Sequence, residues 1–425
     1  MNQRIRYYIC CCVAAIALPL PCGAQTGWDF SSVKTDRGAG MPGAGGDGIA
    51  DDTAAINRTI AAGGIVYFPP GKYRYIGQMT VPVTVPPKSY RFYGDGPGVS
   101  IILFETDATH SVAGINAPNM DANTTLNVDG LTLAAKSEHC GTAIYAAFSE
   151  SGDNFRTATI HNVQIVREAR QEGPGYWTKG IDLLKAKNTV IDKVEISGLY
   201  PETQTGIAWR SSNTYKTTGL QATNLEIKFL QKALETSGWV EGVYLTGFEL
   251  VFCSLQGVPV VDLAADAPAG VQPSTFHLVN GHVQGLGDGV RLRNLTGVKI
   301  SKVHFLHNAA PISGCSMVEV INSTDVVVSK CSFVGANTVI GDPPPPPLPL
   351  ENGILLNNAH SVRIAENSFT AMSSTQGNSI VVPGDSNAVR ITNNLFGNFL
   401  GTGGVLRPYY DKGSDTYYRG NNRAP

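Results

Sequence analysis

The amino-acid sequence predicts an all-β protein, a right-handed parallel β-helix of about ten turns with a short N-terminal capping helix. Three observations predict this fold. A short apolar motif recurs at intervals of about 22 to 36 residues, and such self-similarity is typical of a solenoid. Apolar and other residues alternate inside each copy, which indicates strands. Crossovers between parallel strands are overwhelmingly right-handed, and this gives the predicted hand.

The repeated motif has an aliphatic residue, a second small or apolar position three places later, and another apolar residue two places after that. The clearest copies are VDGLTL (128–133), IHNVQI (160–165), IDKVEI (191–196), LTGFEL (245–250), LVNGHV (278–283), ISKVHF (300–305), VSKCSF (328–333), IAENSF (364–369) and ITNNLF (391–396), with a degenerate copy in GLQATNLEI (219–227). Each solenoid turn packs only on its neighbours, so the core can grow along one axis. We therefore expect residues 25–425 to form a single β-helix domain.

Residues 1–24 have the pattern of a secretory signal peptide. Arg4 and Arg6 precede a short apolar run, and Cys22-Gly23-Ala24 offers a cleavage site near Ala24. The apolar run is too short to span a membrane. The sequence therefore predicts a secreted or periplasmic protein.

Four cysteines remain after the signal peptide, in a compartment that permits disulfides. They are Cys140, Cys253, Cys315 and Cys331. Their spacing assigns no pairing and matches no metal-binding motif. The near-balanced net charge of −2 argues against nucleic acid as a partner, because nucleic-acid binders carry a basic excess. Nothing in the sequence predicts an oligomeric state.

An N-terminal cap is expected over about residues 47–75. The spacing of Ile56 and Ile60 predicts an amphipathic helix over about 52–62, and GGIVYFPPGKYRY (63–75) predicts a strand, a turn and a strand. Solenoids need such a cap over the open end of the core. A C-terminal tail over about 404–425 is expected to fold against the other end.

The opening GDGIADDTAAIN followed by GGIVYFPPGKY resembles the pectate-lyase-like superfamily, and in particular its rhamnogalacturonase and epimerase-like right-handed parallel β-helix proteins. The resemblance implies the β-helix fold and a carbohydrate ligand lying along one sheet. The paired acidic and Gly-His-Gly motifs of the polygalacturonase-like branch do not occur in this chain.

A second set of short strands precedes the repeats, and its in-out alternation predicts an exposed column. Apolar residues such as Ile181 and Leu183 must point inward, so the residues between them point outward. The predicted column contains Asp182, Ala208, Glu235, Asp262, Arg291, Glu319, Leu355 and Val381, and the next outward column contains Arg210 and Arg293. Adjacent strands lie about 4.7–4.9 Å apart. Glu235 and Asp262 are therefore predicted neighbours, whose charges repel unless a cation compensates.

This column is the candidate site. Glu235, Asp262 and Arg291 are the catalytic candidates, and substrate contacts are expected from Asp182, Arg210, Arg293, Glu319 and the aromatic pair Tyr176 and Trp177. Aromatic rings of this kind either stack on sugar rings or pack beneath loops. The charged column itself could also be an ordinary solvated face.

A competing column runs along another sheet and includes Glu249, His282 and His304. These side chains could bind a metal or move protons. Three ligands in one straight column make a poor tetrahedral cage, so no metal site is predicted here.

Three functions are compatible with these features. The first is hydrolysis of a polysaccharide in an elongated groove by the Glu235–Asp262 pair, which requires no cofactor. The second is β-elimination on a uronic-acid polymer, with arginines holding the sugar carboxylate and calcium as a cofactor. The third is a polysaccharide-binding or assembly protein without catalysis.

Overall fold

A computed structural model of the chain describes residues 30–35, 42–83, 89–106, 114–121, 123–150, 157–168, 175–199, 204–253, 258–285, 287–307, 315–335, 351–370, 378–397, 409–413, 415–420 and 422–423. The predicted signal peptide and the proline-rich segment 343–349 lie outside these residues. Within the described part, no helix is long and apolar enough to cross a membrane.

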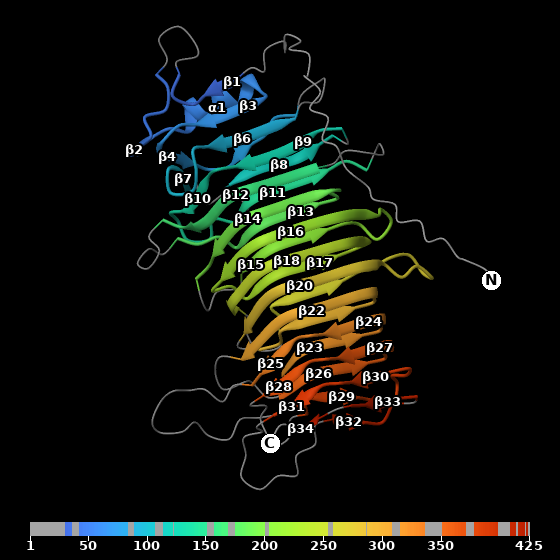
Figure 1. The fold of residues 1–425 in the computed structure, drawn as a ribbon. Coiled ribbons are helices and arrows are strands. Elements are labelled where there is room, and N and C mark those ends of the chain that lie inside the picture. The colour runs from blue at the N-terminus through green and yellow to red at the C-terminus, as the bar shows by residue number, and fades with distance from the viewer. Residues whose placement is uncertain are drawn as a thin grey trace, which may run out of the picture.

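The protein is a right-handed parallel β-helix whose coils stack along one axis (Figure 1). One sheet has twelve strands, and each lies one coil further along the chain. They are β5 (Met79–Thr80), β8 (Ile115–Met120), β11 (Thr142–Phe148), β13 (Lys179–Leu184), β15 (Thr205–Arg210), β17 (Lys232–Ser237), β19 (Val261–Ala264), β21 (Val290–Arg293), β23 (Cys315–Ile321), β26 (Glu351–Asn357), β29 (Ile380–Val382) and β32 (Tyr409–Asp411). The sequence predicted about ten turns, fewer than the twelve strands of this sheet in the described residues. The short strands at both ends carry too little of the apolar pattern to be recognised.

The other 22 strands form a second, folded sheet, and they include the repeats. The N-terminal ones are β1 (Phe30–Ser32), β2 (Asp47–Asp51), β3 (Ile65–Phe68), β4 (Gly71–Ile76), β6 (Tyr90–Gly94), β7 (Ser100–Glu105), β9 (Thr125–Asp129) and β10 (Thr132–Ala135). The central ones are β12 (Thr157–Arg167), β14 (Thr189–Ser197), β16 (Thr217–Lys228), β18 (Val240–Cys253), β20 (Ser274–Gly285) and β22 (Thr296–His307). The C-terminal ones are β24 (Thr324–Ser329), β25 (Ser332–Val334), β27 (His360–Ala365), β28 (Ser368–Thr370), β30 (Arg390–Thr392), β31 (Leu395–Phe396), β33 (Tyr417–Arg419) and β34 (Asn422–Arg423).

From β9 onward, each described coil of the folded sheet turns a corner at one residue with positive φ. These residues are Gly130, Asn162, Lys193, Asn224, Gly247, Asn280, Lys302, Lys330, Glu366, Asn393 and Gly420. A left-handed residue bends a strand sharply, and glycine and asparagine adopt this conformation at least cost. Asn367 and Asn394 lie one residue after this corner in their coils and are buried.

The core runs through the inside of the coils as one apolar cluster. The side chains predicted to point inward fill this core. Among them, Ile181, Leu183, Ile207, Leu292 and Ile354 are all fully buried. Residues between them point away from the core. This strict division fixes the register of the sheets, because a slip of one residue would turn every apolar side chain outward.

The helix α1 (Thr53–Ala62) lies at the N-terminal end of the stack, as predicted (Figure 1). Its buried face contains Ala55, Ile56 and Ile60. Asp52 precedes the helix, but its carboxylate does not cap it and accepts hydrogen bonds from the backbone of Gly45 and Gly46 instead. The Asp52 side chain thus ties the segment before the helix to the helix start.

At the other end, the described tail strands β32 and β33 pair in parallel with β29 and β30 and so add a final coil. The four cysteines of the described chain are all buried.

Candidate functional site

The predicted column lies on the outer face of the twelve-stranded sheet, in the predicted register. Asp182 is paired with Ala208, Ala208 with Glu235, and Glu235 with Asp262. Asp262 is paired in turn with Arg291, and Arg291 with Glu319. The apolar neighbours of these residues are drawn into the core, which leaves the charged side chains outside.

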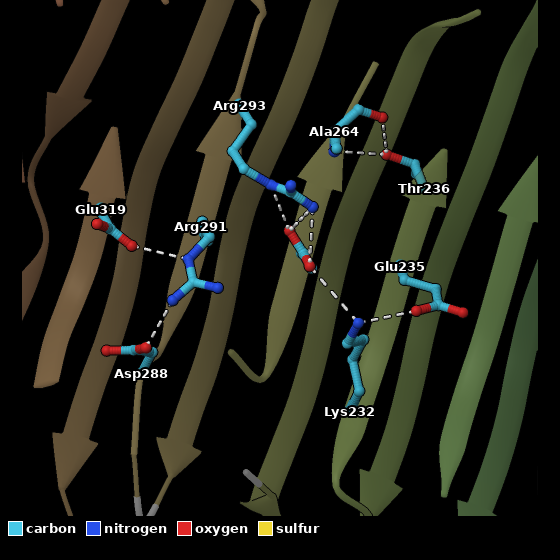
Figure 2. A network of polar contacts seen from close by, with 9 residues as sticks. Lys232, Glu235, Thr236, Ala264, Asp288, Arg291, Arg293 and Glu319 are labelled. Carbon is cyan, nitrogen blue, oxygen red and sulfur yellow. Dashed lines mark hydrogen bonds and ion pairs between the residues drawn. The ribbon is translucent and has the colours of Figure 1, made fainter. Parts of the chain in front are cut away.

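Two carboxylates in the middle of this column share one cation. Lys232 Nζ lies 2.8 Å from Glu235 Oε2 and 3.5 Å from Asp262 Oδ2 (Figure 2). Arg293, from the next outward column, contacts Asp262 at 3.2 Å. The cations compensate the repulsion between the neighbouring carboxylates.

The strand pairing beneath these carboxylates is reinforced by Thr236. Its hydroxyl donates to the carbonyl of Ala264 at 2.9 Å and accepts from the amide of Ala264 at 3.0 Å (Figure 2). Thr236 is buried and follows Glu235 directly. This double contact clamps β17 to β19 at the point where Glu235 and Asp262 lie side by side.

Arg291 belongs to a second cluster further along the column. Its Nε lies 2.7 Å from Glu319 Oε2, and its Nη2 lies 2.9 Å from Asp288 Oδ2 (Figure 2). Burial alone would lower the pKa of Arg291, but the hydrogen bond to Glu319 and the surrounding carboxylates raise it above its ordinary value. Arg291 is therefore a permanent cation and cannot serve as a base.

Asp182 forms the third cluster. Arg210 contacts its two carboxylate oxygens at 2.7 and 2.8 Å, and Lys179 contacts it at 3.0 Å. Only 5% of the Asp182 side chain is exposed. The column was expected to be exposed throughout, but Asp182 and Asp262 are buried because these long basic side chains lie over them.

Sequence reasoning missed three partners of the column: Lys179, Lys232 and Asp288. Each stands three residues before a column residue of opposite charge, in KGID (179–182), KALE (232–235) and DGVR (288–291). Strict alternation would put positions three apart on opposite faces of a strand. The recurring pattern of opposite charges was the available signal.

The two aromatic residues expected in the groove wall are not there. Trp177 is 4% exposed, packs against Phe104 at 5.5 Å between ring centroids, and donates from Nε1 to the carbonyl of Val166 at 3.1 Å. Tyr176 is also buried, and its hydroxyl is hydrogen-bonded to the His139 ring. Their role is packing, because the segment before β13 closes onto neighbouring coils.

The competing column on the folded sheet also has its predicted register, with Glu249 paired to His282 and His282 to His304. The two imidazole centroids are 5.1 Å apart. Burial, then the charge of His304, lowers the pKa of His282. Across the described residues, no group of three or more His, Cys, Asp or Glu side chains is arranged to hold a metal.

The comparisons with known proteins agree with this architecture. The family model described as rhamnogalacturonase A/epimerase, pectate lyase-like matches residues 41–341. A search of curated proteins gives no match. The DFA-IIIase of Arthrobacter chlorophenolicus A6 without its lid is similar in structure, with a TM-score of 0.52 and 12% identity over 82% of this chain and 92% of that one.

The A-module of the Azotobacter vinelandii mannuronan C-5 epimerase AlgE6 has a TM-score of 0.49 and 15% identity, over 90% of this chain and 98% of that one. At such low identity, the DFA-IIIase structure is informative about the fold alone.

Proposed function

Because this chain belongs to the rhamnogalacturonase A/epimerase, pectate lyase-like family, we propose that it is a secreted or periplasmic enzyme that cleaves a polysaccharide on the outer face of the twelve-stranded sheet. The reaction that we propose is hydrolysis of a glycosidic bond. The observation that carries it is the pair Glu235 and Asp262, adjacent in register and joined through Lys232.

Glycoside hydrolysis requires two carboxyl groups flanking the scissile bond. Both carboxylates contact the same Lys232 nitrogen, so their facing oxygens are close together. A short separation, about 5–5.5 Å, belongs to the retaining mechanism, in which one carboxylate attacks the sugar and the other protonates the leaving oxygen. This mechanism requires no cofactor.

The surroundings of the two carboxyl groups indicate which one acts as the acid and which one as the nucleophile. Asp262 has a cation on each side and a side chain that is 11% exposed, which suits a nucleophile that must stay ionised. Glu235 has Lys232 alone among the described cations that contact it, and its side chain is 26% exposed. We assign Glu235 as the acid and Asp262 as the nucleophile.

β-Elimination on a uronic-acid polymer is the second candidate. Arg293 favours it, because its side chain is 44% exposed and a sugar carboxylate could take the place of Asp262 on its guanidinium. Elimination also needs a base, and Arg291 cannot be that base because its guanidinium is a permanent cation. Calcium would have to supply the charge stabilisation in this reaction.

The test is incubation with a panel of neutral and uronic-acid polysaccharides. New reducing ends without unsaturated product indicate hydrolysis, and absorbance of unsaturated uronate indicates elimination. We expect Glu235→Gln and Asp262→Asn each to lower the rate by at least about a hundredfold, because acid–base assistance contributes roughly 10² to 10⁴ in rate.

The matched control is Glu249→Gln, an exposed carboxylate on the folded sheet that should keep full activity. Full activity in both site variants, with a loss in Glu249→Gln, would move the chemistry to the His282–His304 face. Binding without turnover by the parent protein would make it a polysaccharide-binding protein.

A further inference from the structure

A cavity of about 550 Å³ opens at the N-terminal part of the same twelve-stranded sheet. It lies over the ends of β8, β11 and β13. Most of its lining is apolar, and the side chains that matter here are Val81, Met120, Tyr145, Ala147, Phe148 and Leu184. Ligand sites in proteins are concave, largely apolar, and typically about 300–1,000 Å³ in volume.

The cavity adjoins the charged column. Tyr145 on β11 is paired in register with Asp182 on β13, so it is the next member of the column. Leu184 is paired with Arg210 in the second outward row. A chain that lies along the column and passes Asp182 and Arg210 therefore reaches this cavity without leaving the sheet.

Both charged residues of the described cavity lining contact other groups. Lys185 and Asp121 are the charged residues in its described lining. Lys185 Nζ lies 2.7 Å from Glu150 Oε1, and the Asp121 carboxylate accepts the amide of Asn123 at 3.1 Å. Lys185, the cation of the described lining, is thus already held by a carboxylate.

Tyr145 gives the cavity an aromatic face with a polar tip. It is half-buried, and burial, together with the charge of Asp182, raises the pKa of its phenol above the ordinary value. The phenol therefore stays protonated and can donate a hydrogen bond. An aromatic side chain of this kind matches a sugar ring, which has an apolar face and hydroxyl groups at its edge.

We propose that this cavity is a subsite for an uncharged sugar residue, whose ring packs on Tyr145 with its hydroxyl groups toward the rim. The inference rests on the proposed function and narrows its substrate class to a glycan with a neutral unit at this position. A polymer made of uronates alone would place a carboxylate in a largely apolar cavity, where it would have to displace Glu150 from Lys185 or stay unpaired at a large cost.

The test measures binding of short neutral and uronate oligosaccharides by calorimetry. The probes are gluco-, xylo-, manno- and galacto-oligosaccharides and oligogalacturonate. Two variants alter the cavity: Ala147→Trp fills it from an outward position opposite Leu184, and Tyr145→Ala removes the aromatic face. The control is Thr246→Trp, which adds the same bulk at an exposed position of the folded sheet.

The parent protein should bind at least one neutral oligosaccharide. We expect Ala147→Trp and Tyr145→Ala each to weaken that binding at least tenfold, Tyr145→Phe to keep most of it, and Thr246→Trp to keep all of it. Should Ala147→Trp fail to fold, as judged by its circular dichroism, Tyr145→Ala carries the test.

Equal binding by the parent and the Tyr145→Ala variant overturns the proposal. So does a parent protein that binds only oligogalacturonate, or none of the probes. Failure of the catalytic proposal alone would look different from these outcomes. Neutral oligosaccharides would still bind and would still depend on Tyr145, but Glu235→Gln would leave turnover unchanged.

Discussion

The charged side chains on the twelve-stranded sheet differ in how tightly each carboxylate is held. Asp182 is held by a bidentate arginine and a lysine, and it is almost fully buried. Glu235 has a single described cationic partner and keeps a quarter of its side chain exposed. A substrate can approach Glu235 without breaking a bidentate pair. This difference is why we propose Glu235, and not Asp182, as the acid.

Glu105 supplies a test of charge pairing at the residue scale. It ends β7, is 17% exposed, and receives hydrogen bonds from Arg74 at 2.7 and 2.9 Å as well as a contact from Lys136. The Arg74 hydrogen bond lowers the pKa of Glu105 to about 2, and Lys136 adds to this against the opposing effect of burial. Because the pKa is depressed in the folded state, the stabilisation is present above the unfolded value of 4.5 and is lost as the pH falls towards 2.

We therefore predict that Glu105→Gln lowers the free energy of unfolding by about 2 kcal/mol at pH 7, since each unit of pKa difference is worth about 1.4 kcal/mol and the site is partly solvated. The loss should shrink between pH 4.5 and pH 2. Urea unfolding at a series of pH values measures it. Glu249→Gln, on an exposed carboxylate, should stay within about 0.5 kcal/mol at pH 7. A loss for Glu105→Gln that does not change with pH would contradict this account.

At the scale of elements, a ladder of buried asparagine side chains joins three successive coils. Asn367 Oδ1 accepts the amide of Cys331 at 2.9 Å, and Asn367 Nδ2 donates to Asn394 Oδ1 at 3.0 Å. Asn394 Nδ2 donates to the carbonyl of Ile364 at 3.0 Å. Each side-chain amide thus bonds backbone groups on both sides of the corner residue one coil earlier, Lys330 for Asn367 and Glu366 for Asn394.

We predict that Asn394→Leu destabilises the protein by about 1–3 kcal/mol, because it removes Asn394 Oδ1, the acceptor that lies 3.0 Å from the buried backbone nitrogen of Asn367. Chemical denaturation measures the change. The control is Asn322→Gly in the exposed ladder where Asn322 donates to Asn294 at 3.4 Å. Asn322 has φ of 48°, which glycine tolerates, so this change should cost less than about 0.5 kcal/mol. Equal costs for the two variants would rule out burial as the cause.

The sequence predicted the registers of the strands because the alternation continues through each strand interior. It failed at strand beginnings, where Lys179, Lys232 and Asp288 reach the outer face three residues before their partners. It also failed for Trp177, whose burial depends on contacts with Phe104 and Val166 from earlier coils. The alternation of apolar residues predicts which side chains of a strand point inward. It does not predict which residues of one coil pack over another coil, because that depends on the paths of the loops.

In the molecule as a whole, the fold was predictable because each coil repeats the same apolar alternation and packs on its neighbours alone. The cavity beside Tyr145 was not predictable in this way. Its lining comes from the ends of β8, β11 and β13 and from Val81 and Pro82, where the repeat pattern stops. The regular parts of the coils thus determine the fold, and the irregular parts shape this cavity.

The same one-dimensional architecture predicts how far the destabilisation caused by a core substitution extends along the stack of coils. Four phenylalanines stack through the C-terminal coils: Phe305, Phe333, Phe369 and Phe396, with centroid distances of 4.9, 4.7 and 5.2 Å and nearly parallel planes. All are buried. Phe369→Ala removes contacts on both sides and should cost about 3–5 kcal/mol. In a solenoid the loss should stay near the altered coil, because coils further away share no contact with it.

Hydrogen exchange resolves this prediction along the chain. We expect amides in β24, β27 and β30 to lose protection in Phe369→Ala, while those in β12, β14 and β16 keep it. Leu395→Ala is the matched control, since Leu395 lies next to Phe396 but is 46% exposed, and its loss should change stability by less than about 0.5 kcal/mol. Uniform loss of protection from β12 to β30 would mean that the coils unfold as a single cooperative unit. The charged face and the Tyr145 cavity would then depend on packing many coils away, whereas local loss leaves both intact.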